Sequence, residues 1–395
     1  MQLNKDFDIV VFGFGIVSKL FLTSICKLNI KTAVINRKPK SYAHKSIKRG
    51  IALNYSSCQY LKNTGMINNI ELYGNKIKKI LISEKNLPNK IGLSSSDINS
   101  KYLSYVVEES SLEKIFLSSI NYNNTYFFNN YVLHKIKKLN SGWLIFIKKK
   151  KKIILLKTKL LIGIDGTNSC IKKLLKIKNI IHKYDSVAYI FNCYIKKKNK
   201  KIAYQKIFNK GIIACLPLKQ NIMKVVITTS NEEKVYLDSI NSNRLKLYLQ
   251  YIINENIGEI KKITKAVCYG LIGVKSTEVI KKDLLFLGNA AITLNPITAQ
   301  GFNLCVKDIF KFNDIIKKSM YQGNIKISYN NLLYYQLIRH HEHNLIFKNI
   351  NLIYYFFKTN YLFPFYLRNF FFFIFKNSIY LKKKFILYKQ GVLID

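Results

Sequence analysis

The sequence predicts a mixed α/β and α+β fold, with a Rossmann-like domain on a parallel sheet, an inserted antiparallel-sheet domain and a helical C-terminal segment. Three observations predict it. Residues 7–36 read as strand, glycine-rich turn, helix and strand, which is the order of a parallel β-α-β unit. Residues 183–229 are dominated by alternating segments, as antiparallel strands are. Beyond Ser328 the pattern is helical and rich in aromatic residues.

The first elements follow from local patterns. FDIVVF at 7–12 and KTAVIN at 31–36 are short strand-like runs. The helix between them is expected to continue through Leu28. Residues 102–120 read as a strand that runs into a helix.

A hairpin and a further buried strand are expected later in the chain. The lysine run 148–152 reads as the solvated turn of the hairpin, and its second strand is expected to end at Asp165. DLLFLGNA at 283–290 reads as the buried strand.

The charge balance of the chain is strongly basic. At 395 residues the chain is long enough for two or three domains. Its 65 Lys and Arg against 21 Asp and Glu give a formal net charge of +44, which can indicate a nucleic-acid or anionic-membrane partner. However, Lys outnumbers Arg, and Asn, Ile, Tyr and Phe are abundant too, as A+T-rich codons would produce in any protein. Because no nucleic-acid-binding module is recognisable, we expect no nucleic-acid partner.

The cysteines and the N-terminus indicate the compartment. The seven cysteines are dispersed, without a C-x-x-C pair, which argues for a reducing compartment and against a disulfide framework or a zinc site. The first residues lead directly into a strand without signal-peptide features. We therefore expect a cytoplasmic protein. The aromatic and basic run 345–389, with Lys358, Arg368 and Lys376, leaves open a peripheral contact with the inner face of a membrane.

The first motif is GFGIVS at 13–18, a G-x-G-x-x-G fingerprint with serine in the last place. Gly13 permits the tight turn, Gly15 lets the main chain approach a pyrophosphate, and Ser18 allows close packing of helix and strand. Asn36 replaces the acidic residue expected to bind the ribose hydroxyls, and an amide can still form hydrogen bonds to them. The motif predicts a dinucleotide site.

Two further motifs lie at strand ends. GIDGTNS at 163–169 places Asp165 at a strand-to-turn junction, where an Asx-type turn is as good an interpretation as a ligand site. GNAAITLNPITAQGFNL at 288–304 passes from a strand end through Pro296 into a helix. The first N–H groups of that helix can face negative charge.

Together and in this order, the three motifs resemble those of the single-component flavoprotein aromatic hydroxylases, and among them the ubiquinone-biosynthesis hydroxylases. The 2-polyprenyl-6-methoxyphenol hydroxylase branch is most similar, because it carries a G-N-A-A-x-T-L-x-P-I-x-x-Q-G-F-N-L string that residues 288–304 match nearly throughout. Residues 48–61, 105–112 and 207–218 are also similar to segments of the family. The resemblance extends over roughly residues 7–345.

The resemblance implies FAD as the cofactor, with NAD(P)H and O2 as co-substrates. The residues that it assigns to FAD or the pyridine nucleotide are Gly13, Gly15, Ser18, Asn36, Arg49, Asp165, Gly166, Gly288, Asn289, Pro296, Gln300, Gly301, Phe302 and Asn303. The first three would line the pyrophosphate, and residues 296–303 would lie along the isoalloxazine. No catalytic side chain is named, because the flavin carries the chemistry with Pro296, Gln300 and Gly301 beside it.

The patterns and the resemblance together divide the chain into six segments. The expected FAD-binding domain comprises 1–74, 98–176 and 273–344, with the flavin loop and helices in its last part. The expected substrate domain comprises 75–97 and 177–272. Residues 345–395 form the expected C-terminal helical segment.

The resemblance implies a function: FAD- and NAD(P)H-dependent hydroxylation of the ring of a polyprenylated phenol in ubiquinone biosynthesis, through a flavin C4a-hydroperoxide. Two alternatives are related to it: a ubiquinone hydroxylase acting at another ring carbon, and an inactive FAD-binding scaffold of a quinone-synthesis complex. The sequence departs from the family pattern at Asn36, Ala299 and Ser110, so the scaffold function remains an alternative. A third alternative is a binder of anionic surfaces that uses the charge alone.

The segment RHHEH at 339–343 invites a metal hypothesis, since His and Glu at close spacing can ligate. Neighbouring residues on a helix point about 100° apart. Only His340 or Arg339 shares a face with His343. We therefore expect no metal site here.

Overall fold

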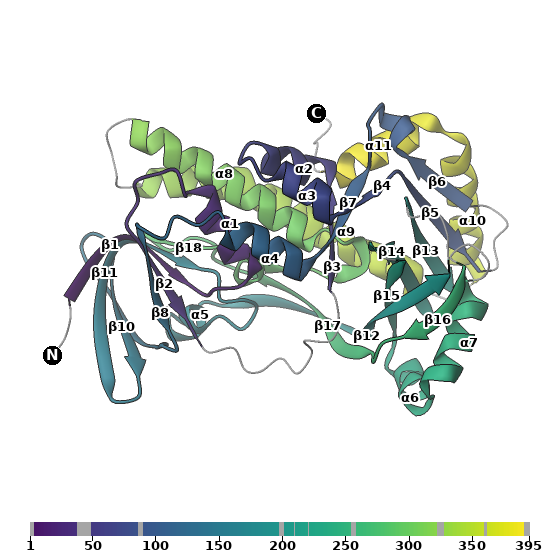
Figure 1. Ribbon diagram of the computed structural model, residues 1–395, viewed down its shortest axis with the longest axis horizontal. Coiled ribbons are helices and arrows are strands. Elements are labelled where there is room, and N and C mark those ends of the chain that lie inside the picture. Colours follow the sequence, from purple (N-terminus) through teal and green to yellow (C-terminus); the bar gives the residue numbers. More distant parts are fainter. Residues whose placement is uncertain are drawn as a thin grey trace.

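In the computed structural model, the described residues are 4–37, 49–85, 90–196, 201–208, 210–219, 221–253, 258–321, 328–358 and 362–390. They form two large sheets at opposite ends of an elongated molecule, with a small third sheet and long helices between them (Figure 1). The predicted mixed class of α/β and α+β is confirmed.

The first sheet has the strand order β8-β2-β1-β11-β10-β9, and β18 pairs with β11. Its parallel pairs involve β1 (Asn4–Phe12), β2 (Thr32–Asn36), β8 (Thr125–Asn129), β11 (Lys152–Gly163) and β18 (Leu284–Phe286). The antiparallel strands are β9 (Val132–Lys138) and β10 (Trp143–Lys149). In β1, Ile9 and Val11 join one apolar core while Val10 and Phe12 join another. The sheet is therefore covered on both faces, as parallel sheets are.

The predicted β-α-β unit is confirmed, although its helix is shorter than expected. α1 (Ile16–Ser24) ends before Leu28. The N–H of Leu28 bonds to the carbonyl of Ile25 in a tight turn, so the helical bonding pattern does not continue. The hairpin is also confirmed, with Lys149 paired to Lys152 across its turn.

Two strand ends differ from the prediction. β11 ends at Gly163 and not at Asp165, because the carboxylate of Asp165 accepts the N–H of Cys170 and turns the chain. β18 covers only Leu284–Phe286 of the predicted 283–290. It ends there because Gly288, with φ of 62°, starts a 3-10 turn.

The second sheet has the order β19-β17-β12-β15-β14-β13-β5-β6, and β16 pairs with β12. The strands are β5 (Lys79–Glu84), β6 (Lys90–Ser94), β12 (Asn179–Lys196), β13 (Ile202–Phe208), β14 (Gly211–Pro217), β15 (Ile222–Ser230), β16 (Glu259–Ile263), β17 (Val267–Ser276) and β19 (Ile292–Thr293). The strands expected within 183–229 are therefore present and mutually antiparallel, apart from 197–200, 209 and 220, which lie outside the described residues. One face packs on α6 (Asn231–Ser239) and α7 (Ser242–Ile253).

A small sheet and several helices lie between the two large sheets (Figure 1). The sheet pairs β7 (Ser104–Glu108) with β3 (Gly50–Asn54) and β4 (Asn75–Ile77), and the helices are α2 (Tyr55–Lys62), α3 (Ile67–Tyr73) and α4 (Glu109–Leu117). α8 (Gly301–Tyr321) packs on α1 and α2 and belongs to the same core.

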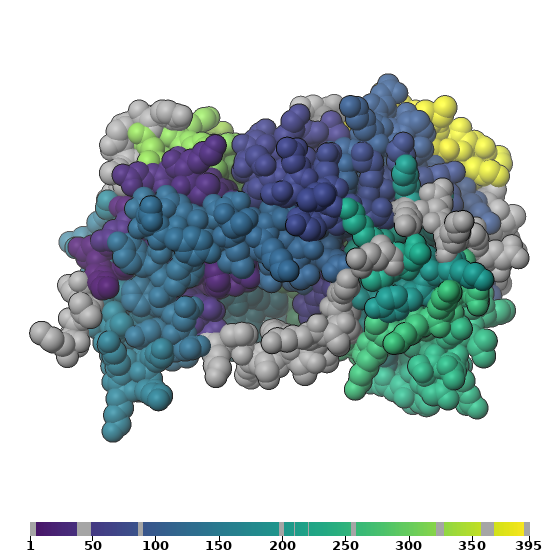
Figure 2. Space-filling view, viewed as in Figure 1, coloured from purple at the N-terminus to yellow at the C-terminus, as the bar shows by residue number. Residues whose placement is uncertain are grey.

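The chain closes with α9 (Tyr329–Lys358), α10 (Leu362–Asn377) and α11 (Ile379–Lys389). α9 continues without a break past residue 344, where the C-terminal segment was expected to begin. Figure 2 shows the last helices, in yellow, at the end of the molecule that carries the second sheet. Within the described ranges, no helix is long and apolar enough to cross a membrane. Residues 391–395 of the predicted segment lie outside the described residues.

Candidate functional site

The glycine-rich turn joins β1 to α1. Gly13 has φ of 112°, and a Cβ there would lie 2.4 Å from the main-chain oxygen of Ile164. A glycine is therefore required, because the turn lies directly on the end of β11. Ser18 is buried, and its hydroxyl donates to the carbonyl of Gly13 at 2.9 Å. The side chain of Ser18 thus holds the turn closed.

The N-terminus of α1 is open and carries no negative charge. Gly15 caps the helix without a side-chain hydrogen bond, and the first turn has no acidic residue. A Cβ on Gly15 would meet no atom within 4 Å. The unpaired N–H groups of a first helical turn and the helix dipole favour a phosphate. This end of α1 fits the pyrophosphate of a dinucleotide.

Asn36 ends β2 at the same edge of the first sheet. Its amide Nδ2 donates to Oδ1 of Asn129, at the end of β8, over 3.1 Å. The pair is uncharged and exposed. Both amides can give up this bond and form hydrogen bonds to hydroxyl groups instead. Such bonds are weaker than those of a carboxylate, because an amide is uncharged.

Asp165 combines an Asx-type turn with a buried acceptor. Its Oδ2 accepts the N–H of Cys170 at 2.6 Å and so supports the start of α5 (Cys170–Leu174). Its Oδ1 is buried without a hydrogen-bond partner among the described residues. Burial raises the pKa of Asp165, against hydrogen bonds from Ser169 and Cys170 that lower it. Gly166 beside it has φ of 85° and open space around the position of a Cβ. The orphaned oxygen fits a hydroxyl donor such as that of a ribitol chain.

The third motif lies against the first two. Gly288 faces the start of α1, since a Cβ there would lie 3.1 Å from Cγ1 of Val17. Asn289 is exposed, and its carbonyl accepts the hydroxyl of Thr293 at 3.1 Å. Thr293 also bonds to Thr167 of the second motif at 2.8 Å. Segments far apart in the sequence thus meet around the end of β11.

Residues 296–303, which we call the flavin loop, join this cluster to α8. Pro296–Thr298 form one 3-10 turn, and Ala299 follows in the left-handed conformation with φ of 52°. Gln300 Oε1 accepts a hydrogen bond from Thr298 at 3.3 Å, and Gly301 starts the helix with open space at its Cβ position. The first turn of α8 is therefore accessible to a ligand that carries negative charge.

Phe302 and Asn303 are used inside the protein. Phe302 packs against the core shared by α1 and α8. Asn303 is buried, accepts the N–H of Asn54 at 2.9 Å and donates to the carbonyls of Ala52 and Ala299 at 2.8 and 3.0 Å. Its side chain therefore ties the flavin loop to β3.

Arg49 lies just before β3 and points toward the second sheet. Its Nη2 donates to the hydroxyl of Tyr269 in β17 at 2.7 Å, and Nη1 lies 3.8 Å from Glu109. Burial raises the pKa of Glu109, although Arg49 opposes this rise. The side chain of Arg49 is 41% exposed, so it remains accessible to an anion.

Lys224 was not predicted from the sequence. It lies in β15 with 8% of its surface exposed, and its Nζ donates to the carbonyl of Gly50 at 2.8 Å. Burial lowers the pKa of Lys224 to about 8, with nearby Glu109 raising it and Arg49 lowering it. A single lysine inside the apolar run NIMKVVITT is the signal that could have indicated it.

The inner face of the second sheet carries Lys224, is apolar around Val226 and is incompletely covered. Ile190, Ala214, Val226 and Tyr269 lie in central strands and are half-buried, whereas the alternate residues of those strands pack under α6 and α7. At one end of this face Val226 packs in the same cluster as Ile297 of the flavin loop. An apolar face beside the loop suits an aromatic substrate with a hydrocarbon tail.

The segment 339–343 forms a charged network between α8 and α9. Arg339 Nε donates to Asp308 Oδ1 at 2.6 Å, His343 Nε2 lies 2.9 Å from the same oxygen, and Lys307 pairs with Glu342 at 2.8 Å. In the part of the chain that the structure describes, no group of three His, Cys, Asp or Glu residues is arranged to hold a metal. The network joins the two helices behind the flavin loop.

Comparisons with known proteins identify a family and several relatives. Residues 15–324 match a family model described as "FAD binding domain". The chain is 22% identical over 316 residues to the ubiquinone hydroxylase UbiM of Neisseria meningitidis, covering 77% of this chain and 67% of that protein. It is 22% identical over 436 residues to the mitochondrial ubiquinone biosynthesis monooxygenase COQ6 of Dictyostelium discoideum, covering 93% and 88%.

The fold is similar to that of a solved monooxygenase. The crystal structure of p-nitrophenol 4-monooxygenase PnpA from Pseudomonas putida superposes with a TM-score of 0.81 at 12% identity, covering 99% of both chains. At this identity the similarity concerns the fold. The predicted resemblance to the ubiquinone-biosynthesis hydroxylases is confirmed by the named relatives.

Proposed function

The chain belongs to the FAD-binding domain family, and on that premise we propose that it hydroxylates the ring of a polyprenylated phenol in ubiquinone biosynthesis, using FAD, NAD(P)H and O2. The observation that carries the proposal is the convergence of three motifs with an apolar sheet face. The turn before α1 lies against Asp165, Gly288 lies against Val17 of α1, Thr293 bonds to Thr167, and α8 packs on α1. Ile297 in the flavin loop packs against the inner face of the second sheet.

In this proposal, the chain's own residues bind and orient the reactants. The first turn of α1 would hold the pyrophosphate, and Asp165 would accept a hydrogen bond from the ribitol chain. When bound, FAD supplies the redox and oxygen-transfer chemistry. The first turn of α8 would stabilise negative charge on the flavin ring, and the inner sheet face would hold the phenol and exclude water. Arg49, exposed and cationic, would meet a phosphate of FAD or the incoming NAD(P)H.

The experiment that tests the proposal measures oxidation of NADH and NADPH by the flavin-loaded protein. We expect oxidation to accelerate when a prenylated phenol is added, with a product heavier by one oxygen in mass spectrometry. Expression in a strain that lacks the corresponding hydroxylase would identify the ring carbon.

A protein that binds FAD but oxidises neither nucleotide with any such phenol would instead be a scaffold subunit of a quinone-synthesis complex. The departures that favour this second function are Ala299, held in a left-handed conformation, Ser110, exposed on α4, and Asn36 at the end of β2.

A prenylated substrate partitions into lipid, so we also propose peripheral contact with an anionic bilayer through α10 and α11. Large apolar side chains are exposed there, namely Leu367, Phe370, Phe371, Phe373, Ile374, Ile379 and Tyr380. Lys383 and Lys384 are exposed on α11 beside them, and cations beside apolar bulk suit lipid headgroups. Arg368 does not take part as expected, because it is buried and paired with Glu84. The side chain of Lys358 lies outside the described residues.

Vesicle flotation tests this contact. We expect the protein to float with anionic vesicles at low salt and less at high salt, since surface charges are screened. Phe370→Ser with Phe373→Ser should remain at the bottom, whereas Leu337→Ser, which removes a side chain 74% exposed on α9, should float like the parent protein. Equal flotation of all three proteins would contradict the assignment to α10.

A further inference from the structure

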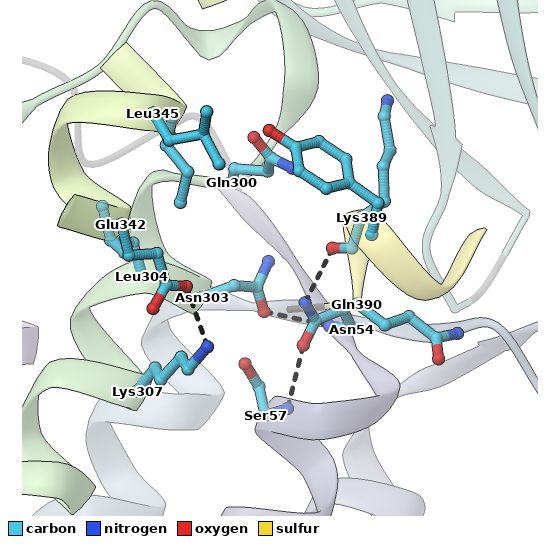
Figure 3. Close-up of a pocket in the computed structure, with 12 residues that line it drawn as sticks. Asn54, Ser57, Gln300, Asn303, Leu304, Lys307, Glu342, Leu345, Lys389 and Gln390 are labelled. Carbon is cyan, nitrogen blue, oxygen red and sulfur yellow. Dashed lines mark hydrogen bonds and ion pairs between the residues drawn. The ribbon is translucent and has the colours of Figure 1, made fainter. Parts of the chain in front are cut away.

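Asn54 lies outside all three motifs, yet it connects the flavin loop to the last helix of the chain. It ends β3 and caps α2, where its Oδ1 accepts the N–H of Ser57 at 2.8 Å. Its main-chain N–H donates to Oδ1 of Asn303 at 2.9 Å. Its Nδ2 donates to the main-chain carbonyl of Lys389, in α11, at 3.2 Å. Figure 3 shows these bonds meeting at Asn54.

The link continues into the flavin loop. Asn303 donates to the carbonyl of Ala299 at 3.0 Å and to that of Ala52 at 2.8 Å. Ala299 is the loop residue held in the left-handed conformation. Two asparagine side chains therefore connect the end of α11 to the most constrained point of the flavin loop.

An apolar contact joins the same parts of the molecule. Ile297 of the flavin loop packs in one cluster with Phe372 of α10 and Ile386 of α11. Outside this cluster, the hydroxyl of Tyr388 in α11 accepts a hydrogen bond from Asn349 of α9. The C-terminal helices therefore contact the loop through both polar and apolar side chains.

A small cavity lies beside the link. Its volume is about 40 Å³, and Asn54, Gln300, Asn303, Tyr388 and Lys389 are among the residues that line it (Figure 3). It has room for only a few water molecules. A shift of α11 would reach Asn54 directly, because the side chain of Asn54 bonds to the main-chain carbonyl of Lys389.

We propose that Asn54 is a positioning residue, which transmits the docked position of α11 to the flavin loop and so makes the C-terminal helices part of the cofactor site. This inference rests on the binding of FAD in the proposed function. Positioning by residues that do not touch a ligand is common, because a binding loop must be held within a fraction of an ångström. Because α11 reaches the loop, whatever docks on the C-terminal helices acts on FAD binding as well, and the coupling is reciprocal.

The test measures the dissociation constant of FAD by fluorescence quenching, together with the absorption spectrum of the bound flavin. Asn54→Asp retains the oxygen that caps α2 but loses the Nδ2 donor, and an acceptor then faces the carbonyl of Lys389. We expect FAD to bind about tenfold more weakly, the effect of losing one buried hydrogen bond, with a shifted spectrum. Ser230→Ala is the matched control, since it removes a cap from α6 on the outer face of the second sheet. It should leave both readouts unchanged.

A chain ending after Asn377 lacks α11 and should bind FAD as weakly as Asn54→Asp. In that shortened chain, Asn54→Asp should not weaken FAD binding further, because the hydrogen bond between Asn54 and Lys389 is already gone. If the shortened chain does not fold, Asn349→Leu, which releases Tyr388, takes its place. Unchanged FAD affinity in Asn54→Asp, or fully additive effects, would overturn the inference. Failure of the parent protein to bind FAD would instead count against the proposed function.

Discussion

Asp165 has two roles that a single substitution can separate. One oxygen supports the start of α5 and the other is a buried acceptor without a partner among the described residues. Asp165→Asn keeps an oxygen for the N–H of Cys170, whereas Asp165→Ala loses both acceptors. We expect Asp165→Ala to lower NAD(P)H-dependent turnover per folded molecule by more than its loss of about 1 kcal/mol in stability explains. Turnover and urea unfolding are measured on one preparation. Asp165→Asn is the control for the turn, because it keeps the acceptor for the N–H of Cys170. Unchanged turnover per folded molecule would leave Asp165 as a turn residue only.

Lys224 predicts a dependence of stability on pH. Its pKa is lowered from 10.5 to about 8, so between these values the unfolded chain binds more protons than the folded one. The free energy of unfolding therefore rises with pH in this window. Lys224→Met removes this contribution, although Arg49 and Glu109 remain. From pH 7.5 to pH 10, the parent protein should gain about 2 kcal/mol relative to the variant in urea unfolding. If the free energies of unfolding of the parent protein and Lys224→Met change with pH in the same way, Lys224 is solvated and the prediction is wrong.

The motif residues could be predicted from the sequence, because their backbone requirements are local. Gly13 and Gly166 need positive φ, and Gly15 leaves room for a phosphate. The hydrogen bond from Ser18 to Gly13 and the use of Asn303 inside the protein could not be predicted. Their partners depend on how the turn closes and on β3, which lies about 250 residues before Asn303 in the chain.

At the scale of elements, the prediction succeeded where the pattern was long and regular. The β-α-β unit and the antiparallel strands of the second sheet were correctly predicted. Element ends were less accurate at α1, β11 and β18. A main-chain turn ends α1, the side chain of Asp165 turns the chain after β11, and Gly288 with positive φ follows β18. The docking of α11 on Asn54 joins positions 335 apart, and no local pattern indicates such a contact.

α10 is held on the second sheet by a buried ion pair. Arg368 Nη2 lies 3.1 Å from Oε1 of Glu84 in β5, with side chains 6% and 8% exposed. Arg368→Leu would leave the carboxylate buried without its partner, so we expect a loss of about 3 kcal/mol in stability. The double change Glu84→Leu with Arg368→Leu should be less destabilising than Arg368→Leu alone. Chemical unfolding of the two single variants and the double variant measures this. A double variant less stable than both single variants would contradict the expectation.

At the scale of the whole molecule, FAD would extend from the first sheet to the flavin loop and stabilise both. We expect the flavin to be non-covalent, because no histidine or cysteine attachment motif accompanies the three motifs. Added FAD at 100 times its dissociation constant should stabilise folding by about 2.7 kcal/mol. Denaturation should release the flavin into the supernatant, and colour retained in the precipitate would contradict non-covalent binding.

α9 sets a limit on how the molecule can move during turnover. Its 30 residues make it about 45 Å long. Near one end Leu332 and Tyr335 pack in the core of the first sheet, and near the other Asn351 and Tyr354 bond to β12. One continuous helix thus fastens both sheets, so they cannot hinge apart without bending it. Substrate must enter by local opening of loops, and the radius of gyration should stay the same from the ligand-free to the loaded enzyme.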